Sequence, residues 1–142
     1  SEAVFREQES KFVSSSLNNN FIQIYFEEAH MIFPPNAGNT IDVYSRFAKE
    51  GAKFNIGIVY STQSPSTVNR DLLSQTENFF IGHLSSSIDT DQLAKIQHAF
   101  HNVGDIIMRQ RTRGLLNVLT HSHRYVIPVQ ANKYNGVSRL VP

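Results

Sequence analysis

The chain has 142 residues, of which 40% are hydrophobic and 18% charged, so it can bury a core and is not of the disordered class. It has no cysteine, which excludes a disulfide scaffold and a thiolate metal site, and no apolar run approaches the ~20 residues of a membrane-spanning helix. Residues 1–30 hold two basic and five acidic side chains, whereas residues 104–142 hold six basic and one acidic. A basic end suits phosphate contacts or a solvated surface.

The first elements predicted along the chain are a helix and a strand. Residues 2–13 fit a helix of modest quality, and the polar run S-S-S-L-N-N-N that follows indicates a loop. Residues 21–26, F-I-Q-I-Y-F, are aromatic and β-branched and predict a buried strand. This strand ends at two acidic residues, Glu27 and Glu28.

The middle of the chain continues the alternation of helix and strand. Residues 41–52 have apolar side chains at helical spacing and predict an amphipathic helix. Residues 54–61 show the clearest strand pattern of the sequence, and T-Q-S-P at 62–65 closes that strand. Residues 71–77 fit a short helix and residues 79–84 another short strand.

The last third begins with a helix and then changes character. Asp89-x-x-Gln92 has the form of an N-cap box, which predicts a helix at residues 90–100. Three short antiparallel strands are expected after it, at residues 105–109, 115–119 and 125–129. The whole order predicts an α/β fold with a mainly parallel sheet, crossover helices and a C-terminal antiparallel hairpin or meander.

The acidic pair at the end of the first strand can carry chemistry. In open α/β sheets, functional sites lie at the carboxyl ends of the strands, and a buried strand delivers Glu27 and Glu28 to that edge. One carboxylate there can hold Mg²⁺ through water, and a second can orient or deprotonate an attacking water. An acidic turn without function is the alternative that this short pattern leaves open.

Four motifs in order resemble those of HerA/FtsK-type P-loop ATPases. They are E-E-A-H at 27–30, K-E-G-A-K-F at 49–54, S-T-Q-S-P at 61–65 and L-S-Q-T-E-N at 73–78. The resemblance covers roughly residues 21–129, and HerA-like translocases are the most similar members. It implies a RecA-like core in which E-E-A-H, with Glu in place of the usual first Asp, is the Walker B motif. S-T-Q-S-P would end the sensor strand beside it.

The resemblance implies roles for individual residues. Glu28 would polarise the attacking water, Glu27 would support Mg²⁺ through water, and Gln63 would sense the γ-phosphate of ATP. An amide suits a sensor because it donates and accepts hydrogen bonds at once. The family's R-E-G-R-K stretch is K-E-G-A-K here. The resemblance also implies residues that act on a neighbouring subunit's nucleotide, and the candidates for this role are Arg46, Lys49 and Lys53. A solvated helix face is the alternative for these three residues.

The phosphate-binding loop of the family, G-x-x-x-x-G-K-[ST], is not in the sequence, since no glycine is followed by lysine. We therefore expect the C-terminal portion of a motor domain, inactive alone, within a protein that hydrolyses ATP with Mg²⁺. The resemblance implies a cytoplasmic homo-hexamer on double-stranded DNA, with a nuclease or other effector as partner and no membrane association. It would act in DNA processing or in defence against phage. The alternative is a non-catalytic ATPase-like module that lacks the loop and serves binding or assembly.

We expect one partial domain in three stretches: a helix and polar loop (1–20), the Walker B and sensor part of the core (21–103), and a basic C-terminal β extension (104–142). The extension's candidates for contact with DNA or a neighbouring subunit are Arg109, Arg111 and Arg113. A charged turn is the alternative for these three arginines.

Overall fold

The computed structural model describes residues 2–14, 21–35, 46 and 48–133. Internal contacts divide the chain into two compact units, Ser1–Thr76 and Glu77–Pro142. The single partial domain with stretches 1–20, 21–103 and 104–142 stays a prediction. The helical segments on either side of residue 103 pack against one another within the second unit.

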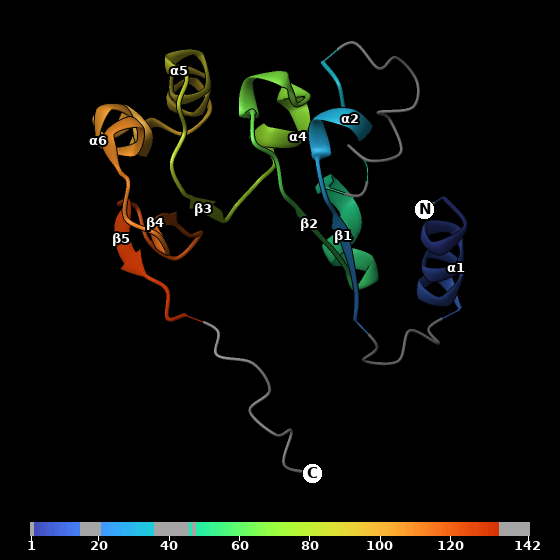
Figure 1. The fold of residues 1–142 in the computed structure, drawn as a ribbon. Coiled ribbons are helices and arrows are strands. Elements are labelled where there is room, and N and C mark those ends of the chain that lie inside the picture. Colours follow the sequence, from blue (N-terminus) through green and yellow to red (C-terminus); the bar gives the residue numbers. More distant parts are fainter. Residues whose placement is uncertain (1, 15–20, 36–45, 47, 134–142) are drawn as a thin grey trace. The chain divides into compact units, whose positions relative to one another are not determined.

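The first unit is built on two strands, with short helices at their carboxyl ends (Figure 1). The strands are β1 (Ile22–Phe26) and β2 (Ile56–Tyr60). The helical segments are α1 (Glu2–Val13), α2 (Ala29–Ile32), η1 (Gly51–Phe54), η2 (Pro65–Thr67) and α4 (Arg70–Ser74). The helix predicted at residues 2–13 is confirmed. Most of the helix predicted at residues 41–52 lies outside the described residues, although Arg46 and residues 48–50 are helical.

β1 and β2 pair in parallel along their full lengths, as the alternation of elements predicted. One face of the pair holds an apolar cluster of Ile24, Phe54, Ile56 and Ile58. The other face is open among the described residues, with Tyr25 69% exposed. The strand predicted at residues 21–26 is confirmed as β1, but only one of its faces packs against the described residues. Successive side chains of a strand point to opposite faces, and burial alternates along β1 accordingly.

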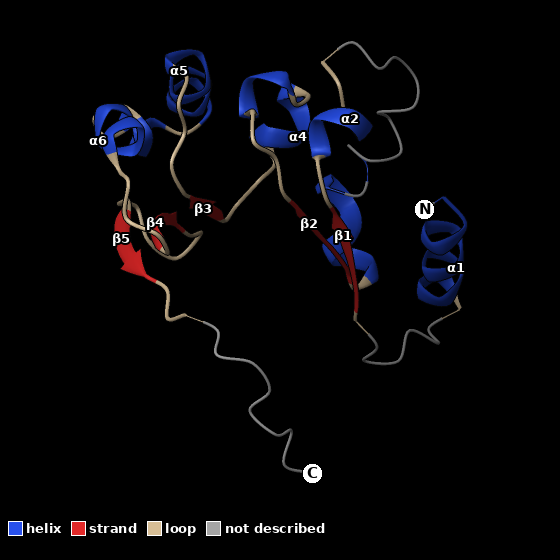
Figure 2. Cartoon of the chain, viewed as in Figure 1, coloured by secondary structure: helices blue, strands red, loops and turns tan. Residues whose placement is uncertain are grey.

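The second unit joins a three-stranded antiparallel sheet, in the order β3–β4–β5, to helices that come between β3 and β4 in sequence (Figure 2). The strands are β3 (Phe79–Ile81), β4 (Leu115–Leu119) and β5 (Ile127–Gln130). The helical segments are α5 (Ser87–Ile96), η3 (His98–Phe100) and α6 (Gly104–Arg109). The α/β class and the C-terminal antiparallel hairpin are thus confirmed. The short strand predicted at residues 79–84 ends at Ile81 and pairs with the antiparallel tail.

The strand predicted at residues 105–109 is instead the helix α6. A short apolar run fits a buried strand and a buried helix equally well, so its period does not decide. In α6, Ile107 is fully buried while its neighbour Ile106 is 56% exposed, so a single face packs inward. Gly104 begins α6 beside Thr90 of α5, where an added Cβ would lie 3.3 Å from the Thr90 Cβ.

The helix predicted at residues 90–100 begins earlier and ends earlier. α5 starts at Ser87 after Ser86 as N-cap residue, so Asp89 lies inside the first turn and does not cap the helix. Asp89 is 5% exposed, so this acidic residue is buried within the second unit and does not lie at the exposed end of a helix. The helix ends at Ile96, and the 3₁₀ turn η3 follows.

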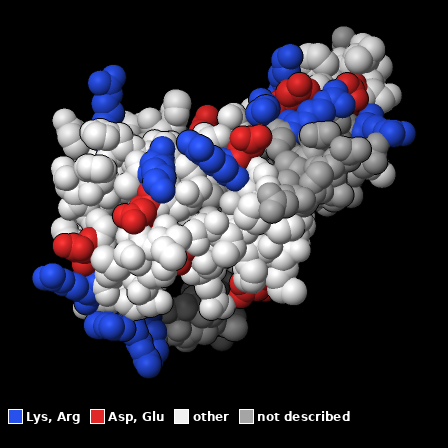
Figure 3. Space-filling view, turned by 90° about the horizontal axis from the view of Figure 1, so that it is seen from above, with Lys and Arg blue, Asp and Glu red and all other residues white. Residues whose placement is uncertain are grey.

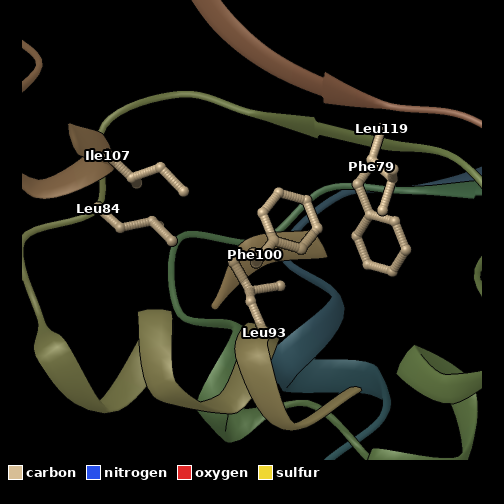
Figure 4. Packing of buried hydrophobic residues seen from close by; sticks show 6 residues of the cluster. All are labelled: Phe79, Leu84, Leu93, Phe100, Ile107 and Leu119. Carbon is tan, nitrogen blue, oxygen red and sulfur yellow. The ribbon is translucent and has the colours of Figure 1, made fainter. Parts of the chain in front are cut away.

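Six buried side chains form the core of the second unit (Figure 4). They are Phe79, Leu84, Leu93, Phe100, Ile107 and Leu119. The ring of Phe100 meets that of Phe79 edge to face, with centroids 5.6 Å apart. The core therefore ties α5, η3 and α6 to the sheet.

Replacing Phe100 with alanine is expected to lower the free energy of unfolding by about 3–5 kcal/mol. Phe100 is 1% exposed, so its loss removes apolar burial and leaves a cavity. The matched control is Phe80→Ala, because Phe80 is 64% exposed and its loss is expected to change stability by less than about 0.5 kcal/mol. Denaturant unfolding of both variants measures the difference, and equal losses would contradict this description of the core.

Candidate functional site

The carboxyl ends of β1 and β2 lie side by side and bring two chain segments together. Beyond the last strand pair, the Ser61 N–H donates to the Phe26 carbonyl at 2.9 Å. The Ala29 N–H in turn donates to the Ser61 carbonyl at 2.8 Å. These bonds carry the pairing of the two segments past the strands, so residues 27–30 and 61–65 share one edge of the sheet. This is the edge at which open α/β sheets place their sites.

Glu28 has a left-handed backbone conformation, with φ 49° and ψ 54°. Such a conformation costs free energy in a residue other than glycine and often marks a functional position. Glu28 is also the N-cap residue of α2, but its side chain makes no capping hydrogen bond. Instead, the Gln63 Nε2 donates to the Glu28 Oε1 at 2.9 Å. The structure therefore brings together the two residues that the sequence singled out most strongly.

The second oxygen of the Glu28 carboxylate faces His30. Glu28 Oε2 is inaccessible to solvent and accepts no hydrogen bond of good geometry within the described residues, but His30 Nδ1 lies 3.4 Å away. The same nitrogen lies 3.5 Å from Thr62 Oγ1, and that oxygen accepts from the Ser64 N–H at 3.2 Å. Sequence reasoning missed His30 and Thr62 as site residues. The signal for them was their place in E-E-A-H and S-T-Q-S-P, since parallel strands in register bring those motifs together.

The loop that carries Gln63 is held by its neighbours. Pro65 starts the 3₁₀ turn η2, and the Thr67 hydroxyl donates to the Ser64 carbonyl at 2.8 Å. The Tyr60 hydroxyl, at the end of β2, is hydrogen-bonded to the Thr76 hydroxyl just beyond α4. Burial raises the pKa of Tyr60, so its hydroxyl stays protonated at neutral pH, while the bond to Thr76 lowers that pKa in part. These contacts fix both ends of the segment around Gln63.

The other acidic residue of the pair, Glu27, is exposed, and it has no hydrogen bond or ion pair within the described ranges. Within the described residues, no group of three His, Asp or Glu side chains could hold a metal ion directly. Mg²⁺ usually keeps several waters and uses one or two carboxylates, so an exposed carboxylate beside Glu28 fits Mg²⁺ held through water. The cradle that ATP phosphates need is not part of this sequence.

The predicted trans-acting residues have partners of their own or face solvent. Arg46 donates through Nη2 to Glu9 at 2.9 Å and through Nε to Glu50 at 3.2 Å. The hydrogen bond to Glu50 is the main reason that the pKa of Arg46 is raised. Lys49 and Lys53 are exposed. Among the described contacts, no hydrogen bond or ion pair joins any of these three cations to Glu28.

The three basic residues of the expected C-terminal extension lie in and after α6. Arg109 ends the helix, and Arg111 and Arg113 are in the loop that leads to β4. Arg111 Nη1 lies 3.2 Å from His83 Nε2. On the face drawn in Figure 3, lysine and arginine side chains lie in separate groups, several of them beside acidic side chains.

The chain shares its fold with solved structures of a packaging NTPase. The genome packaging NTPase B204 of Sulfolobus turreted icosahedral virus 2, solved with AMP, matches with a TM-score of 0.66 and 9% identity over 90% of this chain and 61% of that chain. The same protein solved with ATPγS matches with a TM-score of 0.64. At this identity the likeness establishes the fold alone. No model of a protein family matches the chain.

Curated relatives confirm the resemblance to HerA-type ATPases. A probable helicase of Methanocaldococcus jannaschii is 35% identical over 64% of this chain, and the DNA double-strand break repair helicase HerA of Pyrococcus furiosus is 33% identical over 66%. A probable HerA of M. jannaschii is 27% identical over 82% of this chain. The chain spans 17% of the length of the first two relatives and 23% of the third.

Proposed function

We propose that this chain is the Walker B and sensor portion of an ATP-hydrolysing DNA translocase or helicase of HerA type. One observation carries the proposal: the Glu28 carboxylate, at the carboxyl edge of a parallel strand pair, is held by the Gln63 amide from the neighbouring strand's end. The names of the relatives, helicases and a packaging NTPase, agree with this chemistry.

Glu28 is the general base in this proposal. Its carboxylate would orient the water that attacks the γ-phosphate and accept a proton from it. Gln63 would sense the phosphate, because an amide that donates to Glu28 can turn its N–H groups toward a phosphate oxygen. Binding of ATP would thus loosen the hold of Gln63 on Glu28. Glu27 would hold Mg²⁺ through water, and bound Mg²⁺ neutralises charge on the phosphates.

The phosphate-binding loop would come from chain outside this sequence, and this chain alone would be inactive. The working form would be a homo-hexamer on double-stranded DNA with a nuclease or other effector, in DNA processing or in defence against phage. Arg46, Lys49 and Lys53 are the proposed residues that reach a neighbouring subunit's nucleotide. The proposed contacts with DNA or with a neighbouring subunit are Arg109, Arg111 and Arg113.

The test is ATP hydrolysis by the intact protein, measured with and without duplex DNA. A motor is expected to hydrolyse ATP in the presence of Mg²⁺ and to do so faster when duplex DNA is added. No hydrolysis under either condition would favour the second candidate, a non-catalytic module for binding or assembly. That candidate has one observation in its favour, the lack of G-x-x-x-x-G-K-[ST] in this sequence.

Replacing Gln63 with alanine is expected to separate ATP binding from hydrolysis. The variant loses the donor to Glu28 Oε1 and the sensor for the phosphate, so kcat is expected to fall by about 10–10²-fold while the Kd for ATP changes little. Gln23→Ala is the control, since Gln23 is an exposed amide on β1. Steady-state kinetics and nucleotide titration of both variants make the measurement, and unchanged turnover in Gln63→Ala would count against the sensor role.

A further inference from the structure

The environment of Glu28 Oε2 is not explained by the proposed roles of Glu28 and Gln63. Gln63 satisfies only Oε1. Oε2 is fully shielded from solvent, and a shielded carboxylate oxygen without a donor is costly. Within the described residues, His30 Nδ1 is the ring nitrogen that faces this oxygen, at 3.4 Å.

We propose that His30 is a positioning residue for Glu28: its Nδ1–H donates to Oε2 and sets the direction of the carboxylate when Gln63 turns to the phosphate. The proposal rests on the proposed ATPase function and deepens it. A small closing movement from 3.4 Å brings the pair to the usual length of a charge-assisted hydrogen bond. His30 then replaces Gln63 as the group that holds the base.

The local backbone favours this arrangement. Glu28 has a left-handed backbone, and its side chain caps no N–H of α2 but accepts from Gln63 beyond the end of β2. His30 lies in the same short helix, and Ala29 between them is fully buried and hydrogen-bonded to Ser61. The two side chains therefore leave the same short segment, whose middle residue is buried and hydrogen-bonded.

Thr62 fixes the ring of His30 from the opposite segment. Its Oγ1 lies 3.5 Å from His30 Nδ1, and the N–H of Ser64 donates to that Oγ1. The hydroxyl can accept from an Nδ1–H or donate to a bare Nδ1, so it is compatible with either tautomer. An ionised carboxylate only accepts, so Oε2 beside the same ring nitrogen favours the tautomer that carries its proton on Nδ1.

The experiment compares His30→Ala, His30→Asn and His30→Gln in the intact protein. Removal of the donor in His30→Ala is expected to lower kcat for ATP hydrolysis by about 10–10²-fold, with KM for ATP within about twofold of the wild type, since a misplaced base harms the chemical step. Asparagine places an amide N–H at the position of Nδ1 and is expected to restore most of kcat. Glutamine places its amide N–H one carbon further from the backbone and is not expected to restore kcat. His98→Ala is the control, because His98 is an exposed histidine of the second unit.

Each outcome decides the proposal. A wild-type kcat in His30→Ala would overturn the proposal. Equal losses of kcat in the alanine and asparagine variants, in proportion to their losses of thermal stability, would also overturn it. If His30→Ala does not fold, Thr62→Val gives the second measurement: a fall in kcat with unchanged KM supports the proposal, and unchanged kcat contradicts it. Full hydrolysis in a Glu28→Gln variant would overturn the proposed function itself, whereas an inactive Glu28→Gln beside a fully active His30→Ala would overturn only the role of His30.

Discussion

Glu28→Gln in the intact protein is expected to lower kcat for ATP hydrolysis by about 10²–10⁴-fold while ATP binding persists. Glutamine has the shape of glutamate, and its amide oxygen can still accept from Gln63, so the edge of the sheet keeps its structure. What is lost is the carboxylate that takes the proton from water. The variant is therefore expected to trap bound ATP.

The measurement is single-turnover hydrolysis beside a nucleotide titration. Glu77→Gln serves as the control, since Glu77 is exposed and lies outside the first unit. ATPase activity near the wild-type level in Glu28→Gln would remove Glu28 from the role of base. Loss of ATP binding together with turnover would instead mean that Glu28 supports the nucleotide and not the chemical step.

Arg46→Ala is expected to lower kcat by about 10³–10⁵-fold if its guanidinium stabilises the transferred phosphoryl group of a neighbouring subunit. In this chain the guanidinium is bound to Glu9 and Glu50. Both pairs are exposed, and exposed ion pairs exchange partners readily. Exchange of these exposed partners would let the proposed Arg46 contact a phosphate across an interface.

Mixing subunits provides the test of the role of Arg46. Subunits with Arg46→Ala, combined with Glu28→Gln subunits, are expected to recover part of the activity, because some interfaces then join an intact Arg46 to an intact Glu28. Lys49→Ala and Lys53→Ala subunits, mixed in the same way, show whether a lysine holds this role instead. No recovery at any ratio for Arg46 would leave it as a surface residue that binds Glu9 and Glu50.

The contact between Glu28 and Gln63 could be predicted because it follows from strand direction. Two apolar runs, each ending in polar residues, place those residues at one edge when the strands are parallel. The same rule could have pointed to His30 and Thr62, but their distance depends on the left-handed turn at Glu28, which no sequence pattern marks. The backbone conformation of Glu28 therefore decides whether His30 and Thr62 lie near the carboxylate, which the motifs alone do not show.

The errors in secondary structure also have a physical origin. Residues 115–119 were predicted as a strand with their bounds, although their one polar residue, Asn117, is buried. Residues 105–109 are too few to show a period, and packing of Ile107 in the core decides in favour of helix. Asp89 has the sequence of a cap but lies in the first turn of α5, because the helix starts at Ser87. Tertiary packing, more than local preference, places these elements.

The left-handed backbone of Glu28 would set the proposed catalytic role of this residue against the stability of the fold. A residue with a side chain is strained there by about 1–2 kcal/mol, and glycine is not. A sequence optimised for stability alone would therefore replace Glu28 with glycine, or with asparagine, which tolerates the same conformation. A substitution at Glu28 that stabilises the domain would therefore remove the proposed general base, and the proposed motor would become more stable while it loses hydrolysis.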